Sequence, residues 1–178
     1  GMAYGEDPRQ GYEAEGIFYH PGLRFSFPVP AKWKLNNSPT NVQIVSEQKD
    51  ALIALFAANE KTPAEAARVF VSKTKGQVVR AEALQVNGLP AQRVFSDHAA
   101  QQGNLRIVSY FIQKDNQVYA FHGVSPQNAA AKYETLFVNS MGGFKELTAP
   151  ERINVQPDRV RIRTTQRTQT LESHLRSF

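Results

Sequence analysis

The sequence predicts an α+β fold in which an antiparallel β-sheet is sandwiched between helices, with a short basic appendage at the C-terminus. Three observations predict this class. Residues 105–124 contain two strand-like runs around a tight turn, both runs are apolar on both faces, and one helical pattern precedes them and another follows. A strand that is apolar on both sides must be covered on both sides, which places this hairpin between two layers.

The predicted central hairpin is formed by Leu105–Ile112 and Val118–Val124, which are rich in β-branched and aromatic residues. The residues from Lys114 to Gln117 connect the two runs, and the Asp and Asn among them tolerate the positive φ of a two-residue hairpin turn. This turn sets Ser109 directly opposite His122 in the neighbouring strand. The hairpin therefore predicts a cross-strand Ser–His contact in the middle of the sheet.

The size and composition of the chain indicate one domain with appendages. It has 178 residues, a net charge of +5 and no cysteine, so disulfides, thiol catalysis and cysteine-ligated zinc are excluded. No apolar run approaches the ~20 residues of a membrane-spanning helix, and no signal-peptide pattern opens the chain. Gly1 before Met2 is typical of a cleaved tag, and we expect the chain to be a fragment of a longer, exported protein.

Residues 16–148 are predicted to form the domain, and residues 1–15, which are polar and rich in glycine, a linker or docking segment. Short strands are expected at Ile17–Tyr19 and Leu23–Phe27, and a hairpin at Val42–Ser46 and Ala51–Ala57. The intervening residues 36–39 are predicted to be a loop.

A first helix is predicted to begin at Thr62, with Pro63 at its first position and Glu65 completing a capping box. It is expected to run to about Lys75 and to end at Gly76. A further hairpin, Val78–Val86 and Ala91–Asp97, follows through the turn Asn87-Gly88.

A second helix is predicted to begin with Ser125 as its N-cap and Pro126 next to it. Its apolar residues share one helical face, as expected for a helix that covers a sheet: Ala129, Tyr133, Leu136, Phe137 and Met141. The pair Gly142-Gly143 is expected to end it.

The basic appendage comprises residues 149–178. Residues 151–178 carry six arginines against Glu151, Asp158 and Glu172, a net charge of +3. No aromatic stacking residues lie nearby, which argues against nucleic-acid binding. Trp33, between two lysines, is read either as a core residue or as a contact residue. The candidate partner-binding residues are Trp33, Arg161, Arg163 and Arg167.

The sharpest catalytic hypothesis is a Ser109–His122 dyad, because an adjacent imidazole activates a serine hydroxyl. The alternative is a buried polar pair whose members satisfy each other, and we favour it because a mid-strand nucleophile beneath a helix is not reachable by substrate. Asp97 is the strand carboxylate nearest to completing a triad, and its register is not predictable. No H-E-x-x-H pattern and no histidine pair at metal-ligand spacing occurs, so no metal site is predicted.

Two stretches resemble a known family. The segments from Tyr4 to Gly11 and from Phe18 to Pro30, together with the turn from Asn87 to Ala91, resemble the region that follows the catalytic domain in bacterial zinc-dependent metallopeptidases of the HtpX/BepA-like class. The tail 160–178 resembles the LysM-like ending of those proteins in a degenerate form. Thr168-Gln169 stands where they have Gly-Asp, which argues against glycan binding there.

The segment from Phe25 to Trp33 also resembles the PsbP/Mog-type fold, an antiparallel sheet between helices. Together the resemblances imply a non-catalytic accessory module of a cell-envelope or periplasmic zinc metallopeptidase that positions substrate or partner proteins. They imply zinc in a separate catalytic domain, no cofactor in this chain, and a protein partner: the protease domain itself, its substrate or another envelope protein. The alternatives are a stand-alone PsbP-like protein that binds a membrane-associated complex, and a hydrolase that uses Ser109 and His122.

Overall fold

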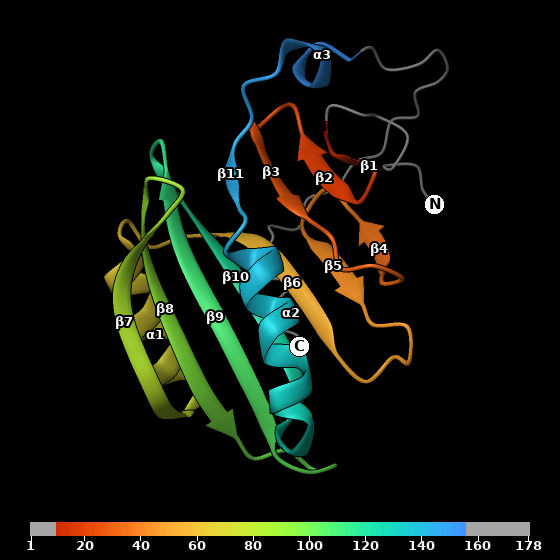
Figure 1. Cartoon of the computed structure of the whole chain (residues 1–178). Helices are drawn as coiled ribbons and strands as arrows, with labels where there is room; N and C mark the ends of the chain where they lie inside the picture. The colour runs from red at the N-terminus through yellow and green to blue at the C-terminus, as the bar shows by residue number, and fades with distance from the viewer. Residues whose placement is uncertain (1–9, 156–178) are drawn as a thin grey trace.

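The computed structural model describes residues 10–155, which form two antiparallel sheets and three α-helices (Figure 1). The large sheet has the strand order β4-β5-β6-β10-β9-β8-β7 and the small sheet the order β1-β2-β3-β11. The large sheet comprises β4 (Lys34–Asn37), β5 (Val42–Val45), β6 (Leu52–Ala58), β7 (Gln77–Val86), β8 (Leu89–His98), β9 (Leu105–Lys114) and β10 (Gln117–Pro126). The small sheet comprises β1 (Tyr12–Ala14), β2 (Ile17–His20), β3 (Phe25–Pro28) and β11 (Lys145–Glu146).

The two longer helices lie on opposite faces of the large sheet. Figure 1 shows α2 (Ala130–Met141) in front of that sheet and α1 (Pro63–Thr74) behind it, with the short α3 (Pro150–Ile153) beyond the small sheet. The predicted sandwich is thus confirmed. No helix within residues 10–155 is long and apolar enough to cross a membrane.

The central hairpin has the predicted register. Ser109 pairs with His122 across β9 and β10, and Asp115 in the connecting turn has φ 58°. Because β10 also pairs with β6, the hairpin occupies the middle of the sheet and both of its faces are buried. The face towards α1 carries Phe111, and the face towards α2 carries Tyr110.

Helix α1 begins as predicted. The N-cap Thr62 accepts a hydrogen bond of 3.1 Å from the backbone N–H of Glu65, and Pro63 occupies the first turn. The left-handed residue at its end is Lys75, with φ 56°, instead of Gly76. The N–H of Lys75 still bonds the Val71 carbonyl at 2.9 Å, and the left-handed conformation of Lys75 ends the helix one residue earlier than expected.

The predicted start of the second helix is wrong. Ser125 is not its N-cap, because β10 continues to Pro126 and pairs there with Arg106 and Leu105 of β9. A 3₁₀ turn (Gln127–Ala129) follows, and α2 begins at Ala130. Continued strand pairing outweighs the local capping signal, as tertiary context often does.

Two further elements were not predicted. Asn36 and Asn37, expected in a loop, belong to β4 and pair with β5 at the edge of the large sheet. Within residues 1–15, Tyr12–Ala14 forms β1 against β2. The strands predicted at Ile17–Tyr19 and Leu23–Phe27 correspond to β2 and β3 of the small sheet, whereas its two-residue strand β11 has no sequence signal.

An aromatic cluster joins the two sheets. Phe25 and Phe27 of β3 contact Tyr119 and Phe121 of β10, with ring centroids 5.3 Å and 5.0 Å apart. Phe144, which follows α2, is fully buried against three of these rings. The small sheet, α2 and the front of the large sheet therefore share one core, and the face behind the large sheet is left to α1.

Candidate functional site

A cavity of about 600 Å³ lies between α1 and the back of the large sheet. We call it the α1 pocket. Its helical wall is one stripe at spacings of three and four residues, which is the face a helix turns towards a sheet: Ala66, Val69, Phe70, Lys73 and Thr74. Its sheet wall includes Phe56, Ile107, Phe111, Ala120, His122 and Val124. The volume lies in the range of small-molecule binding sites.

Small residues on both walls help to leave the pocket open. Ala66 on the helix and Ala120 on the sheet are buried, and their short side chains leave space that larger ones would fill. Close packing is the rule in protein interiors, where voids larger than a water molecule are few. A cavity of this size is therefore larger than an ordinary packing defect.

The predicted Ser109–His122 pair lies at the floor of this region. Ser109 Oγ and His122 Nδ1 are 2.7 Å apart, and the two residues are 0 % and 3 % exposed. Three phenylalanine rings surround the imidazole. The centroid distances are 4.5 Å to Phe70, 5.6 Å to Phe111 and 5.7 Å to Phe56.

Burial lowers the pKa of His122 to about 3, with His98 adding a small effect of the same sign. Removal from water disfavours the charged imidazolium, so His122 is neutral at physiological pH. A neutral imidazole that bonds one serine through Nδ1 and is flanked by aromatic rings forms a buried polar pair with that serine. This arrangement fits the interpretation favoured from the sequence.

The geometry lacks what a catalytic dyad needs. Ser109 is fully buried and does not line the α1 pocket, so its hydroxyl does not face a space that a substrate enters. Asp97, the carboxylate considered as a third member, is bound instead to Arg106 and to Gln127, at 2.5 Å and 3.1 Å. Asp97 therefore does not orient His122 as the carboxylate of a catalytic triad would.

A second serine–histidine pair lies at the rim of the pocket. Ser96 Oγ and His98 Nε2 are 2.7 Å apart, and His98 is half-buried. Burial lowers the pKa of His98 as well, while Asp97 opposes that shift. Gly76 faces this imidazole, and a Cβ there would lie 2.3 Å from the ring, so the chain approaches His98 closely only because residue 76 is glycine.

The rim also carries opposite charges at its two ends. Glu60 lies before the N-terminus of α1 and Lys73 in its last turn, and both border the pocket. Within residues 10–155, neither side chain makes an ion pair with another residue. The entrance is polar while the interior is apolar.

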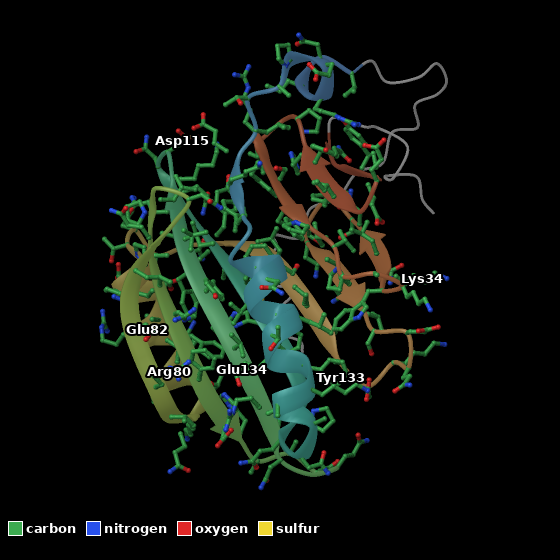
Figure 2. All side chains as sticks on the ribbon, in the orientation of Figure 1. Lys34, Arg80, Glu82, Asp115, Tyr133 and Glu134 are labelled. Carbon is green, nitrogen blue, oxygen red and sulfur yellow. The ribbon has the colours of Figure 1, made fainter. Side chains whose placement is uncertain are left out.

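The other side of the sheet carries a charged network beside α2. Figure 2 shows Arg80 and Glu82 on β7 and Glu134 on α2, and Arg80 lies 3.9 Å from the Glu134 carboxylate. Arg93 forms an ion pair with Glu82 and donates to the Tyr110 hydroxyl at 3.1 Å. The charges of this network compensate one another, and exposed pairs of this kind contribute little to stability.

The other predicted site residues divide into two groups. Trp33 is half-buried and packs edge-on against Tyr133 and Phe137 of α2, at 5.8 Å and 6.1 Å. Arg161, Arg163 and Arg167 lie outside the described residues. Their role in partner binding, with that of Trp33, stays a prediction. Within residues 10–155 no group of three or more histidine, cysteine or carboxylate side chains is arranged to hold a metal ion.

The α1 pocket is not predictable from the sequence. Its one usable signal was the alternation of small and aromatic residues on the strands beneath α1, such as Phe56 beside Ala58 and Phe111 opposite Ala120. That pattern predicts a buried face but not how completely a helix fills it.

Comparison with known proteins gives matches in structure alone. No protein-family model and no curated protein sequence matches the chain. The cyanobacterial PsbP protein CyanoP of Synechocystis sp. PCC 6803 superposes with a TM-score of 0.60 at 10 % identity, covering 73 % of this chain and 91 % of CyanoP.

Two further solved structures have the same architecture. LpqN of Mycobacterium tuberculosis, described as involved in cell envelope biogenesis, has a TM-score of 0.51 at 13 % identity and covers 70 % of this chain and 83 % of its own. The Ran-binding protein Mog1p of Saccharomyces cerevisiae has a TM-score of 0.51 at 12 % identity, with coverages of 74 % and 94 %. Identities this low establish the fold and nothing more. The chain therefore has a PsbP/Mog-like fold.

Proposed function

We propose that this domain is a non-catalytic binding domain that serves as an accessory part of a larger cell-envelope protein or complex, and that the α1 pocket is its binding site. The observation that carries the proposal is the pocket itself, an apolar space of about 600 Å³ that ends on a neutral, buried histidine. Binding requires a preformed apolar cavity with few polar groups, and this site has that composition. A hydrolase would require an accessible nucleophile, and Ser109 is enclosed.

The proposal predicts saturable binding of a neutral apolar probe. N-phenyl-1-naphthylamine, which fluoresces strongly only in apolar surroundings, is expected to bind the folded domain at one site. Val69→Phe places a larger side chain on the helical wall of the pocket and is expected to weaken binding at least tenfold. Val138→Phe is the matched control, since Val138 is a half-buried valine on α2 that does not line the pocket.

Circular dichroism of both variants checks that each is folded. Equal affinity of the probe for Val69→Phe and for the unaltered protein would contradict the assignment of the pocket. So would the absence of saturable binding to the unaltered, folded domain.

The finer part of the proposal concerns the parent protein. We propose that the domain follows the catalytic domain of a zinc metallopeptidase in the cell envelope, where it positions substrate or partner proteins. This part is supported by the motif resemblance of residues 4–30 and 87–91, while the envelope location is also supported by the shared fold of LpqN. The complete reading frame tests it: an H-E-x-x-H motif upstream is the expected result, and its absence from a complete frame would contradict the metallopeptidase assignment.

A further inference from the structure

One polar atom that borders the α1 pocket has no hydrogen-bond partner within the described part of the protein. His122 uses Nδ1 for Ser109, and its Nε2 has no hydrogen-bond partner among residues 10–155. The sealed side-chain polar atoms without partners in this part of the chain are Asn37 Oδ1 and Asn41 Nδ2. Nε2 is not one of these sealed atoms, and His122 lines the pocket, so this nitrogen borders the pocket space.

The surroundings of Nε2 determine which chemical group of a ligand can form a hydrogen bond with it. Phe56, Phe70 and Phe111 flank the imidazole, and Ala66, Val69 and Phe70 of α1 extend the apolar wall over about 6 Å of helix. A ligand in this space has a planar or elongated apolar body. A buried nitrogen that it left unpaired would cost affinity, whereas an oxygen placed at Nε2 would restore the hydrogen bond.

The charge state of the site disfavours an anion at that position. His122 is neutral, and the charged side chains that border the pocket, Lys73 and Glu60, lie at its rim. An ionised carboxylate in the interior would lose its hydration without gaining a charged partner. A hydroxyl is neutral, and it either donates or accepts, so it matches both tautomers that the Ser109 contact allows.

We infer that the α1 pocket binds a neutral, hydroxyl-bearing apolar small molecule whose hydroxyl bonds His122 Nε2 and whose body packs against Phe56, Phe70 and Phe111. The inference rests on the proposed binding function and specifies the chemistry of the ligand. The Ser109–His122 pair positions the ligand. Ser109 fixes the orientation of the His122 ring, and the second ring nitrogen then forms a hydrogen bond with the ligand's hydroxyl.

Three probes of nearly equal shape test the inference by competition with N-phenyl-1-naphthylamine at pH 7. They are 2-naphthol, 2-methylnaphthalene, which replaces the hydroxyl by a methyl group, and 2-naphthoate, which carries a charge. We expect 2-naphthol to bind about tenfold more tightly than 2-methylnaphthalene, equivalent to ~1.4 kcal/mol for one buried hydrogen bond, and 2-naphthoate to bind most weakly.

Two double variants show whether His122 is responsible. Ser109→Ala/His122→Phe removes both polar partners while keeping an aromatic ring, and the preference for 2-naphthol over 2-methylnaphthalene is expected to disappear. Tyr133→Phe/Ser140→Ala removes two hydrogen-bonded hydroxyls of α2, which do not line the pocket, and is expected to keep the preference.

The outcomes separate this inference from the function on which it rests. Equal binding of 2-naphthol and 2-methylnaphthalene to the unaltered protein would overturn the inference while leaving the pocket a binding site. Tightest binding of 2-naphthoate, with its loss in Lys73→Gln, would overturn it in favour of an anionic amphiphile. Failure of every probe, N-phenyl-1-naphthylamine included, would overturn the proposed function itself. The comparison of ligands on unaltered protein decides the matter even if a double variant does not fold.

Discussion

Between pH 6.5 and pH 4 the contribution of His122 to the free energy of unfolding is expected to fall by about 3 kcal/mol. The folded state keeps His122 neutral because burial lowers its pKa from 6.5 to about 3. The unfolded state takes up a proton below pH 6.5, so it binds more protons than the folded state in this window, and stability decreases as the pH falls. One unit of pKa difference corresponds to about 1.4 kcal/mol.

The double variant Ser109→Ala/His122→Phe isolates this effect. The variant lacks the titrating imidazole of residue 122. Carboxylates and the other histidines contribute to the pH dependence of both proteins alike. One of these is His20, whose pKa is lowered by burial to about 4. Urea denaturation at several pH values measures the difference between the two proteins. Between pH 6.5 and pH 4 we expect the unaltered protein to lose about 3 kcal/mol more of its free energy of unfolding than the double variant loses. Parallel pH profiles of the two proteins would contradict a buried neutral His122.

Replacing Phe144 with alanine is expected to destabilise the protein by about 3–5 kcal/mol, the usual cost of removing a fully buried phenylalanine ring. Phe144 is 0 % exposed, and its ring centroid lies 4.9 Å from that of Phe25 and 5.7 Å from that of Phe121. These contacts connect the small sheet to the large one. The backbone carbonyl of Phe144, which accepts a hydrogen bond from Asn87, is retained in the variant.

Thermal or chemical denaturation measures the loss, and hydrogen exchange locates it. Amide protection is expected to decrease most in β2 and β3, because Phe144 packs against both Phe25 of the small sheet and two aromatic rings of β10. Leu23→Ala is the control, since Leu23 is 44 % exposed and its truncation is expected to change stability by no more than about 0.5 kcal/mol. A loss below about 1 kcal/mol in Phe144→Ala would mean that the aromatic cluster does not hold the two sheets together.

The parts of this fold that were predictable are those in which local and long-range signals agree. The turn at Asp115, the apolar runs on either side of it and the alternation of faces all specify the same hairpin, and the pairing of Ser109 with His122 follows from its register. Thr62 and Pro63 likewise determine where α1 begins, because the capping bond and the proline act within one turn of helix.

The predictions from sequence fail where tertiary contacts override a local signal. Ser125 has the chemistry of an N-cap, yet pairing with β9 extends β10 past it. Asn36 and Asn37 resemble a loop but form β4 because β5 offers an edge to pair with. The α1 pocket depends on how far α1 stands from the sheet, and a sequence pattern does not encode that distance.

The central claim is that His122 is a neutral member of a buried pair at an apolar binding pocket, with a binding role and no role in proton transfer. The most direct measurement is the ¹⁵N chemical shifts of the His122 ring by NMR between pH 8 and pH 5. Unchanged shifts of a single neutral tautomer throughout this range are the expected result. Half-protonation of the ring near pH 6.5 would show a solvated imidazole and would contradict the account.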